Sequence, residues 1–286
     1  MNLVYQAYGR ADILRQTAFS IVSLFKVVAS SSPLNVVVYT DNKKFFADFF
    51  GSNERLVIVE VTPDQIKKWR GAIDFVHRVK IEVLLDAAAK FTGSLFYVDG
   101  DTYFVTDPTK LFTSIGDEQS LMHVAEYKIA DGRDPLAKKI RKFLADTVVE
   151  VSGEKVKVLP EHFMFNAGVL GLTEKNKNLL PLILELTDKM FVLYGKHVIE
   201  QLAFSYYLQT RTHVLTCDDV IGHYWNQKDD FQTSIDDFLA EFKTWDAAKG
   251  AYPQNFLWPT PDSAKPKRGW RSTVAASLRQ FLGFRP

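Results

Sequence analysis

The sequence predicts an α/β fold in which a mostly parallel sheet is flanked by helices. Short apolar runs rich in β-branched and aromatic residues alternate with longer segments of helical spacing, the pattern of βαβ units. One such run, residues 95–98, ends abruptly in the carboxylates of Asp99 and Asp101. Ligands of open α/β sheets bind beyond the carboxyl ends of the strands, so a site is expected at this position.

The N-terminal part contains the clearest alternation of strands and helices. Apolar residues follow helical spacing from 12 to 29, and the Ser-Ser-Ser-Pro stretch at 30–33 ends the helix. The β-branched run at 34–40 is typical of a parallel strand buried on both faces. The expected order is strand 3–7, helix 12–29, strand 34–40, helix 44–50 and strand 56–61, a doubly wound arrangement.

The later elements and the domain organisation follow from similar patterns. A glycine at 195 is typical of a helix end, here of a helix over 177–194. The other expected elements are a helix from 74, a strand at 95–98, a helix at 134–145, a hairpin at 148–158, a strand through Phe165–Val169 and a helix from 197. We expect one domain over 1–260, with halves at 1–110 and 111–260. A basic tail follows at 261–286.

Composition limits the classes of partner and compartment. The formal net charge of the 286 residues is +1, which gives no reason to expect nucleic acid as a partner. The single cysteine, Cys217, excludes an internal disulfide and fits a reducing compartment. The first residues lack the pattern of a signal peptide, and no apolar run is long enough to span a bilayer. We therefore expect a cytoplasmic protein.

The strongest motif is the Asp-x-Asp (DXD) pair formed by Asp99 and Asp101. Two carboxylates this close repel each other unless a positive charge lies between them. A divalent cation such as Mn²⁺ or Mg²⁺ accepts such oxygen ligands and keeps positions open for substrate phosphates. Gly100 allows the backbone to approach the ligand closely. The alternative from the residues alone is a turn at the end of a strand with a capping Asp.

The sequence around this pair, Tyr97-Val-Asp-Gly-Asp-Thr-Tyr-Phe-Val-Thr-Asp-Pro108, resembles the GT-A glycosyltransferases. The similarity is greatest to the glycogenin and galactosyltransferase-like (family 8) group. The resemblance implies a Rossmann-like GT-A sheet with a smaller acceptor-side subregion. It makes 1–110 the nucleotide-binding half and 111–260 the acceptor and catalytic half. It also implies a hexosyltransferase-like enzyme that uses Mn²⁺ or Mg²⁺, a nucleotide-diphosphate sugar (a UDP-sugar favoured) and a glycan, lipid or protein acceptor. The resemblance to family 8 also implies that transfer retains the configuration of the sugar at its anomeric carbon.

The same resemblance assigns residues to the nucleotide. In family members the end of the first strand cradles the base and ribose, so Tyr5, Ala7 and Tyr8 would line the base pocket with Asp41 nearby. An aromatic residue at a strand end is also often part of the core. A basic residue on the helix from 74 would contact the diphosphate. Arg78 is preferred to Lys80 because a guanidinium grips phosphate oxygens bidentately; the alternative is a surface cation.

Two further motifs imply the sugar site and the catalytic residues. In relatives the Asn of a Phe-Asn-Ala-Gly-Val strand lies beside the donor sugar, which assigns Asn166 here. Family 8 enzymes carry Asp-Gln at a helix start, and this chain has Glu200 and Gln201. The alternative for Asn166 is an amide that satisfies backbone groups at a β-bulge, and the alternative for Glu200 is an acidic residue that the helix dipole favours.

A third motif implies the last metal ligand. Relatives complete the metal site with His in a His-x-x-Gly-x-x-Lys-Pro-Trp pattern, whose Lys meets the diphosphate. Here His223 precedes Lys228 by five positions, Gly222 lies before the histidine, and Lys-Pro-Trp is absent. We assign His223 as metal ligand because neutral imidazole suits Mn²⁺. The alternative is a buried structural histidine.

The C-terminal segment differs from the rest of the sequence in charge and in its apolar pattern. Residues 264–286 are basic, and Trp270, Val274 and Leu278 share one helical face. This segment is predicted to lie on the inner face of a membrane as a peripheral contact, to close over phosphates as a lid, or to pack on the domain as a helix. The oligomeric state is open.

Other functions remain in competition with sugar transfer. Haloacid-dehalogenase-type phosphatases also place Asp-x-Asp after a strand, but near the chain start and with Thr or Val where this chain has Tyr103. Sugar nucleotidyltransferases begin with a Gly-rich basic loop, which the segment 3–13 lacks. The non-enzymatic alternative is a module that binds a sugar nucleotide without transferring it.

Overall fold

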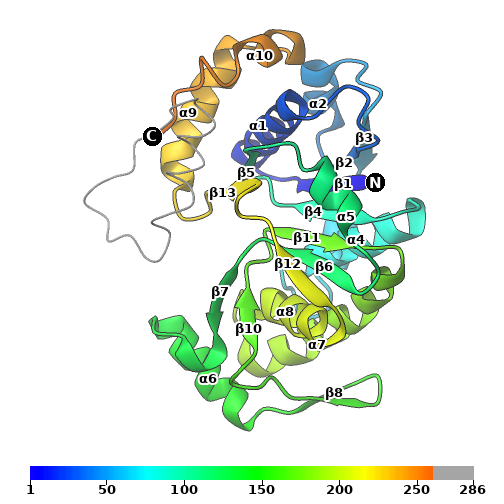
Figure 1. Cartoon of the computed structure of the whole chain (residues 1–286), viewed down its shortest axis with the longest axis vertical. Coiled ribbons are helices and arrows are strands. Elements are labelled where there is room, and N and C mark those ends of the chain that lie inside the picture. Colours follow the sequence, from blue (N-terminus) through cyan, green and yellow to red (C-terminus); the bar gives the residue numbers. More distant parts are fainter. Residues whose placement is uncertain (260–286) are drawn as a thin grey trace. The chain divides into compact units, whose positions relative to one another are not determined.

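The structure is a computed structural model that describes residues 1–259 (Figure 1). The chain divides into two compact units. Unit 1 comprises Met1–Val4, Val61–Tyr97 and Ile115–Thr216, and unit 2 comprises Tyr5–Glu60, Val98–Ser114 and the described chain from Cys217. Each unit is therefore assembled from segments that are far apart in the sequence. The predicted basic tail, 261–286, lies outside the described residues.

A seven-stranded sheet forms the framework, as the sequence predicts. Its strands are β1 (Asn2–Ala7), β2 (Asn35–Thr40), β3 (Leu56–Glu60), β4 (Leu95–Val98), β6 (Gln119–Met122), β11 (Val169–Leu172) and β12 (His213–Thr216). They are ordered β12-β6-β11-β4-β1-β2-β3. The pairs β1–β4, β2–β3 and β12–β6 are parallel, and β11–β6 is antiparallel. The fold is thus α/β with a mostly parallel sheet.

Unit 2 is built around the long helix α1 (Ala11–Val27), which packs on β5 (Thr102–Phe104) and on α9 (Lys228–Glu241). Most residues in the middle of α1 are buried, and Phe19 makes ring contacts with Phe238 and Tyr252. Apolar burial on this scale drives the association of the helices. The remaining elements of the unit are α2 (Lys43–Phe50), α5 (Thr109–Ser114), β13 (Ile221–His223) and α10 (Trp245–Ala251).

Unit 1 contains a set of helices and short strands. Helix α7 (Leu180–Tyr194) packs against both α4 (Arg78–Lys90) and α8 (Ile199–Arg211). Gly195 ends α7 in the left-handed conformation, with φ of 62°, as predicted. The other elements are α3 (Pro63–Trp69), β7 (Ala125–Lys128), η1 (Ile129–Asp131), α6 (Pro135–Asp146), β8 (Val149–Val151), β9 (Glu154–Val156), β10 (Phe163–Phe165) and η2 (Lys175–Leu179).

Two predicted elements differ in the structure. The helix expected from residue 74 begins at Arg78, because Asp74 has a φ of 49° and belongs to the turn after Trp69. The strand expected through Phe165–Val169 is interrupted. It divides into β10 and β11, and the pairing register of β10 with β7 shifts between Met164 and Phe165. Asn166 therefore lies in a connection between strands.

Among residues 1–259, no helix has both the length and the apolar character needed to cross a membrane.

Candidate functional site

The two carboxylates lie in a short turn of unit 2 between β4 and β5, and a chain of buried hydroxyl groups supports it. The Tyr5 hydroxyl bonds to Ser20 Oγ at 2.9 Å, and Ser20 Oγ bonds to Thr102 Oγ1 at 2.8 Å. Thr102 Oγ1 in turn donates to the carbonyl of Asp99 at 2.9 Å. Because buried polar groups are costly to leave without hydrogen bonds, this series of hydroxyl groups fixes the turn against β1 and α1.

The pairing of two short strands brings His223 to the same turn. Strands β5 and β13 pair antiparallel, with His223 opposite Thr102 and Gly222 opposite Tyr103. A Cβ on Gly222 would lie 2.4 Å from the Tyr103 ring, so only glycine fits there. The glycine before His223, which departs from the family motif, is thus explained by cross-strand packing.

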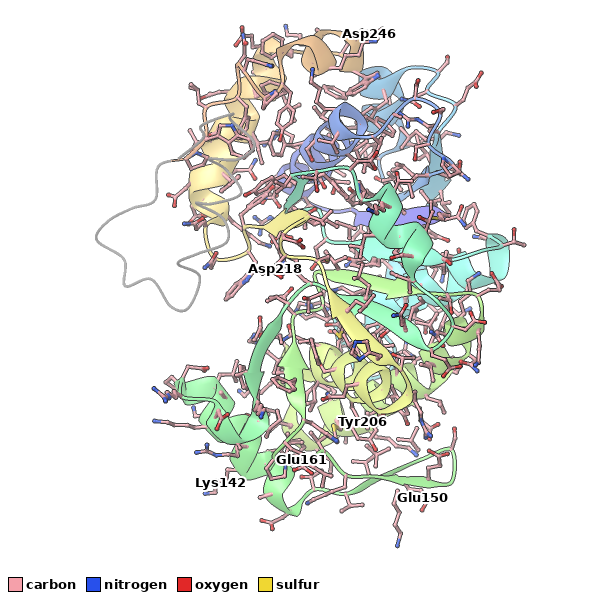
Figure 2. All side chains as sticks on the ribbon, viewed as in Figure 1. Lys142, Glu150, Glu161, Tyr206, Asp218 and Asp246 are labelled. Carbon is pink, nitrogen blue, oxygen red and sulfur yellow. The ribbon has the colours of Figure 1, made fainter. Side chains whose placement is uncertain are left out.

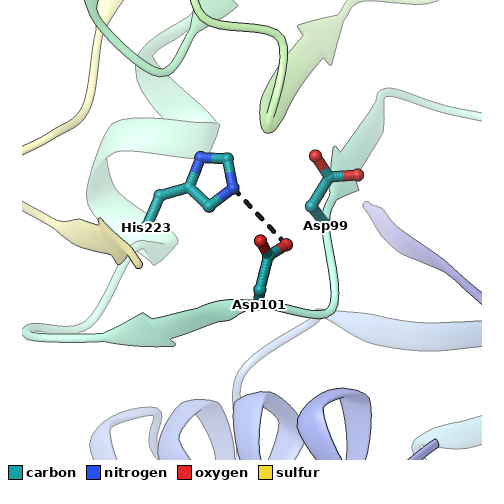
Figure 3. A group of neighbouring side chains, drawn as sticks. All are labelled: Asp99, Asp101 and His223. Atoms are coloured by element: carbon teal, nitrogen blue, oxygen red, sulfur yellow. Dashed lines mark ion pairs between the residues drawn. The ribbon is translucent and has the colours of Figure 1, made fainter. Parts of the chain in front are cut away.

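The side chains of Asp99, Asp101 and His223 converge (Figure 3). One ligand atom from each lies within 4.8 Å of the others. The closest pair is His223 Nε2 and Asp101 Oδ1, at 3.4 Å, and both residues are buried. Burial alone would raise the pKa of the Asp101 carboxyl, but His223 and Lys228 outweigh it and lower the pKa below its usual value.

Lys228 is the first residue of α9, and its ammonium contacts the same carboxylate. The Lys228 Nζ atom lies 2.8 Å from Asp101 Oδ2, and the lysine side chain is half exposed. Asp101 therefore has a donor or cation on each of its two oxygens. The charge of Lys228 partly offsets the negative charge that Asp99 and Asp101 place in this turn.

The donor set fits a divalent cation. Carboxylate oxygens suit Mg²⁺ and Mn²⁺, and imidazole adds preference for a transition metal. The spacing of Asp99, Asp101 and His223 allows each to offer one atom to a single ion. Gly100 also has a packing role, because a Cβ there would lie 2.5 Å from Thr17 Oγ1 on α1.

The residues predicted to line a base pocket differ in how far the structure buries them. Tyr5 is fully buried and belongs to the hydroxyl chain described above, so it is a core residue rather than an exposed stacking surface. Ala7 is buried as well. Tyr8 is partly exposed, and Asp41 Oδ2 accepts a hydrogen bond from the Gly9 amide at 2.9 Å. Asp41 thus joins the ends of β1 and β2.

Unit 1 holds a second group around the buried pair of Lys80 and Glu200. Lys80 Nζ lies 3.2 Å from Glu200 Oε1 and donates to the carbonyl of Ala167 at 3.0 Å. It also lies 5.0 Å from the centroid of the Tyr97 ring. A buried carboxylate needs such a partner, because desolvation of an isolated charge is strongly unfavourable.

Asn166 and Gln201 meet at a residue that the sequence analysis missed. Asn166 Nδ2 donates to Glu126 Oε1 at 3.0 Å, and Gln201 Nε2 donates to Glu126 Oε2 at 2.9 Å. Glu126 lies on the short strand β7, and no catalytic motif surrounds it in the sequence. The structure brings Glu126 to Asn166 through the pairing of β7 with β10, which ends at Phe165, and the sequence offers no local cue for this pairing.

Arg78 makes hydrogen bonds and ion pairs with other residues of unit 1. Its guanidinium binds Asp188 through Nε at 2.8 Å, Glu82 at 2.6 Å and the carbonyl of Trp69 at 2.7 Å. The side chain is 11% exposed. These contacts tie α4 to α7, and a role for Arg78 on a diphosphate stays a prediction.

The predicted residues therefore form two groups. In unit 2, the three predicted metal ligands and Lys228 lie together. In unit 1, Lys80 joins Glu200, and Asn166 joins Gln201 through Glu126. Asp218, labelled in Figure 2, lies in the turn that leads into β13.

Comparison with solved structures identifies the class of fold. The galactosyltransferase LgtC in complex with donor and acceptor sugar analogues matches with a TM-score of 0.52 and 13% identity, over 99% of this chain and 95% of that chain. The glycosyltransferase GlyE of Streptococcus pneumoniae matches with a TM-score of 0.52 and 14% identity, over 91% of this chain and 66% of that chain. An active-site variant of LgtC matches with a TM-score of 0.51 and 13% identity, over 75% and 72% of the two chains.

The chain thus has the GT-A fold, which confirms the predicted resemblance at the level of architecture. LgtC is a member of family 8. No protein-family model matches the sequence, and no curated protein sequence matches it.

Proposed function

We propose that the protein is a metal-dependent glycosyltransferase that moves a sugar from a nucleotide-diphosphate sugar, with a UDP-sugar favoured, to a glycan, lipid or protein acceptor. The observation that carries this proposal is the group of Asp99, Asp101 and His223 at the end of a strand of a GT-A sheet. The fold supports sugar transfer as the reaction class, and the side-chain chemistry supports a cation and a diphosphate as its partners.

The residues of unit 2 suit a divalent cation and a diphosphate group. Asp99, Asp101 and His223 would hold a divalent cation, which would supply Lewis-acid stabilisation of negative charge on a departing diphosphate. Lys228 is half exposed and carries a flexible ammonium, so it can turn from Asp101 towards phosphate oxygens. The hydroxyl chain from Tyr5 to Asp99 holds the turn in place while ligands bind and leave.

The residues of unit 1 suit the hydroxyl groups of a sugar. Glu200 is a buried carboxylate whose charge Lys80 balances, so it can accept hydrogen bonds from sugar hydroxyls or act on a developing positive charge at the anomeric carbon. The amides of Asn166 and Gln201 offer hydrogen bonds to further hydroxyls. The similarity to family 8 favours retention of anomeric configuration.

The experiment that tests this function is a donor-hydrolysis assay. The protein is incubated with Mn²⁺ and a panel of nucleotide sugars, and release of the nucleoside diphosphate is measured. We expect slow, Mn²⁺-dependent hydrolysis of at least one donor, because a transferase without acceptor loses its sugar to water. Asp101→Ala should lower the rate at least 100-fold, roughly the effect of removing a main electrostatic group.

The assay also separates the competing functions. A module that only binds the donor would retain it intact, and a phosphatase would release inorganic phosphate from simple phosphate esters. Either result, with no nucleoside diphosphate formed from any donor, would contradict the proposal.

A further inference from the structure

We propose that Glu126 is a positioning residue that orients the amide groups of Asn166 and Gln201, and so sets which sugar hydroxyls unit 1 recognises. This inference rests on the proposed function. It goes further than that function because it assigns sugar discrimination to a residue outside the family motifs.

The geometry around Glu126 is that of one carboxylate shared by two amides. Each of its oxygens accepts one N–H, from Asn166 at 3.0 Å and from Gln201 at 2.9 Å. The two donors come from different elements, since Asn166 follows β10 and Gln201 lies in the first turn of α8. Glu126 thus fixes the relative position of the two side chains.

Chemistry allows only one orientation of each amide in this arrangement. An ionised carboxylate accepts hydrogen bonds and cannot donate, so each amide must turn its NH₂ group towards Glu126. Rotating either amide by half a turn would place its oxygen against a carboxylate oxygen. Asn166 is fixed at its other end as well, because its Oδ1 accepts the Gly168 amide at 2.9 Å.

This orientation decides what the amides offer to a ligand. The Gln201 carbonyl oxygen diverges from the NH₂ group that Glu126 holds, so it is presented elsewhere as a hydrogen-bond acceptor. The NH₂ group of Gln201 also has a second hydrogen that can donate. A sugar ring presents hydroxyl groups that both donate and accept, so a fixed pattern of donors and acceptors discriminates between epimers.

The partners of Glu126 distinguish it from other exposed carboxylates of unit 1. Glu118 pairs with Lys175 at 2.7 Å, and Glu154 pairs with Arg211. Such exposed ion pairs contribute little to stability. Glu126 instead binds the amides of two residues that the resemblance to family 8 assigns to the sugar site, which indicates a role in recognition.

The test is the nearly isosteric variant Glu126→Gln. A glutamine has one acceptor oxygen in place of two, so it can hold only one of the two amides in its present orientation. We expect Mn²⁺-dependent affinity for the preferred nucleotide sugar to fall about tenfold, the effect of one or two hydrogen bonds. Affinity for the free nucleoside diphosphate should change less than about twofold, and the order of preference among epimeric donors should alter.

The matched control is Glu150→Gln. Glu150 is an exposed glutamate on β8 of the same unit and is labelled in Figure 2. It should leave both affinities unchanged. If Glu126→Gln lowers the affinities for the nucleotide sugar and for the free diphosphate equally, or leaves the order of donors intact, the positioning role is overturned.

A second measurement keeps this inference separate from the proposed function. In NMR spectra of the free protein, the side-chain amide signals of Asn166 and Gln201 should both shift in Glu126→Gln and remain in place in Glu150→Gln. Unchanged signals would overturn the inference directly. A wild-type protein that binds no nucleotide sugar would overturn the proposed function, and the amide signals would still decide whether Glu126 orients the pair.

Discussion

At the scale of single residues, Asp101 is the most constrained group of the candidate site. Its side chain is buried, with His223 Nε2 at 3.4 Å from one oxygen and Lys228 Nζ at 2.8 Å from the other. A divalent cation at this carboxylate would experience the positive charge of Lys228 at close range. Lys228 therefore opposes cation binding, although it favours binding of a diphosphate.

Replacing Lys228 by methionine should separate these two effects. We expect Lys228→Met to bind Mn²⁺ more tightly, because a positive charge next to the cation is removed. The affinity should rise about tenfold, or about 1.4 kcal/mol, and not more, because the lysine is half exposed and solvent screens much of its charge. The same variant should bind a nucleoside diphosphate more weakly at saturating Mn²⁺. Electron paramagnetic resonance of free Mn²⁺ measures the first affinity, and calorimetry measures the second.

The control for this prediction is Lys249→Met. Lys249 is a half-exposed lysine of unit 2 that pairs with Asp246. Its loss should leave both affinities unchanged. An unaltered or weaker Mn²⁺ affinity in Lys228→Met would show that the Lys228 ammonium does not compete with the metal.

At the scale of elements, the hairpin formed by β8 and β9 is linked to α7 through one carboxylate. Glu185 accepts hydrogen bonds from Lys189 Nζ at 2.6 Å, from Ser152 Oγ at 2.7 Å and from the Ser152 amide at 3.1 Å. The bond from Lys189, followed by those from Ser152, lowers the pKa of Glu185 to about 2. The ionised form is therefore the one that holds the hairpin.

This link predicts a dependence of stability on pH. Because the folded pKa lies below the unfolded value of about 4.5, the stabilisation is complete above pH 4.5 and is lost as the pH falls towards 2. Glu185→Gln should thus be less stable than the wild type at pH 5, by less than about 1 kcal/mol because the group is partly exposed. The difference should narrow at pH 3.

Urea unfolding at the two pH values measures this difference. Glu161→Gln, an exposed site before β10 that is labelled in Figure 2, is the control. A gap between wild type and Glu185→Gln that stays constant or widens on acidification would contradict the assigned role of Glu185.

The sequence predicted elements best where local pattern and burial agree. The strand at 95–98 has the predicted bounds, because a continuous apolar run between polar turns permits little else. The predicted start of α4 was wrong by four residues, because the residue type alone does not show that Asp74 adopts a left-handed backbone conformation. The pairing of β5 with β13 was not predicted, because two three-residue strands far apart in sequence carry almost no local pattern.

At the scale of the whole molecule, the candidate residues come from segments that are distant in the chain. Asp99, Asp101 and His223 could be grouped from sequence only through a resemblance to known motifs, and the structure places them together. Glu126 escaped that approach because no motif includes it. Tyr5 was expected at a base and is buried in the core, since an aromatic residue at a strand end fits either place.

The proposed function depends on a cation that Asp99, Asp101 and His223 would hold for a diphosphate. Calorimetric titration of a nucleotide sugar in the presence of Mn²⁺, repeated in chelator and with Asp101→Asn, tests it most directly. We predict binding by the wild type with Mn²⁺, and none in chelator or in the variant, with the variant still folded by circular dichroism. Equal binding without metal, or by Asp101→Asn, would contradict the account.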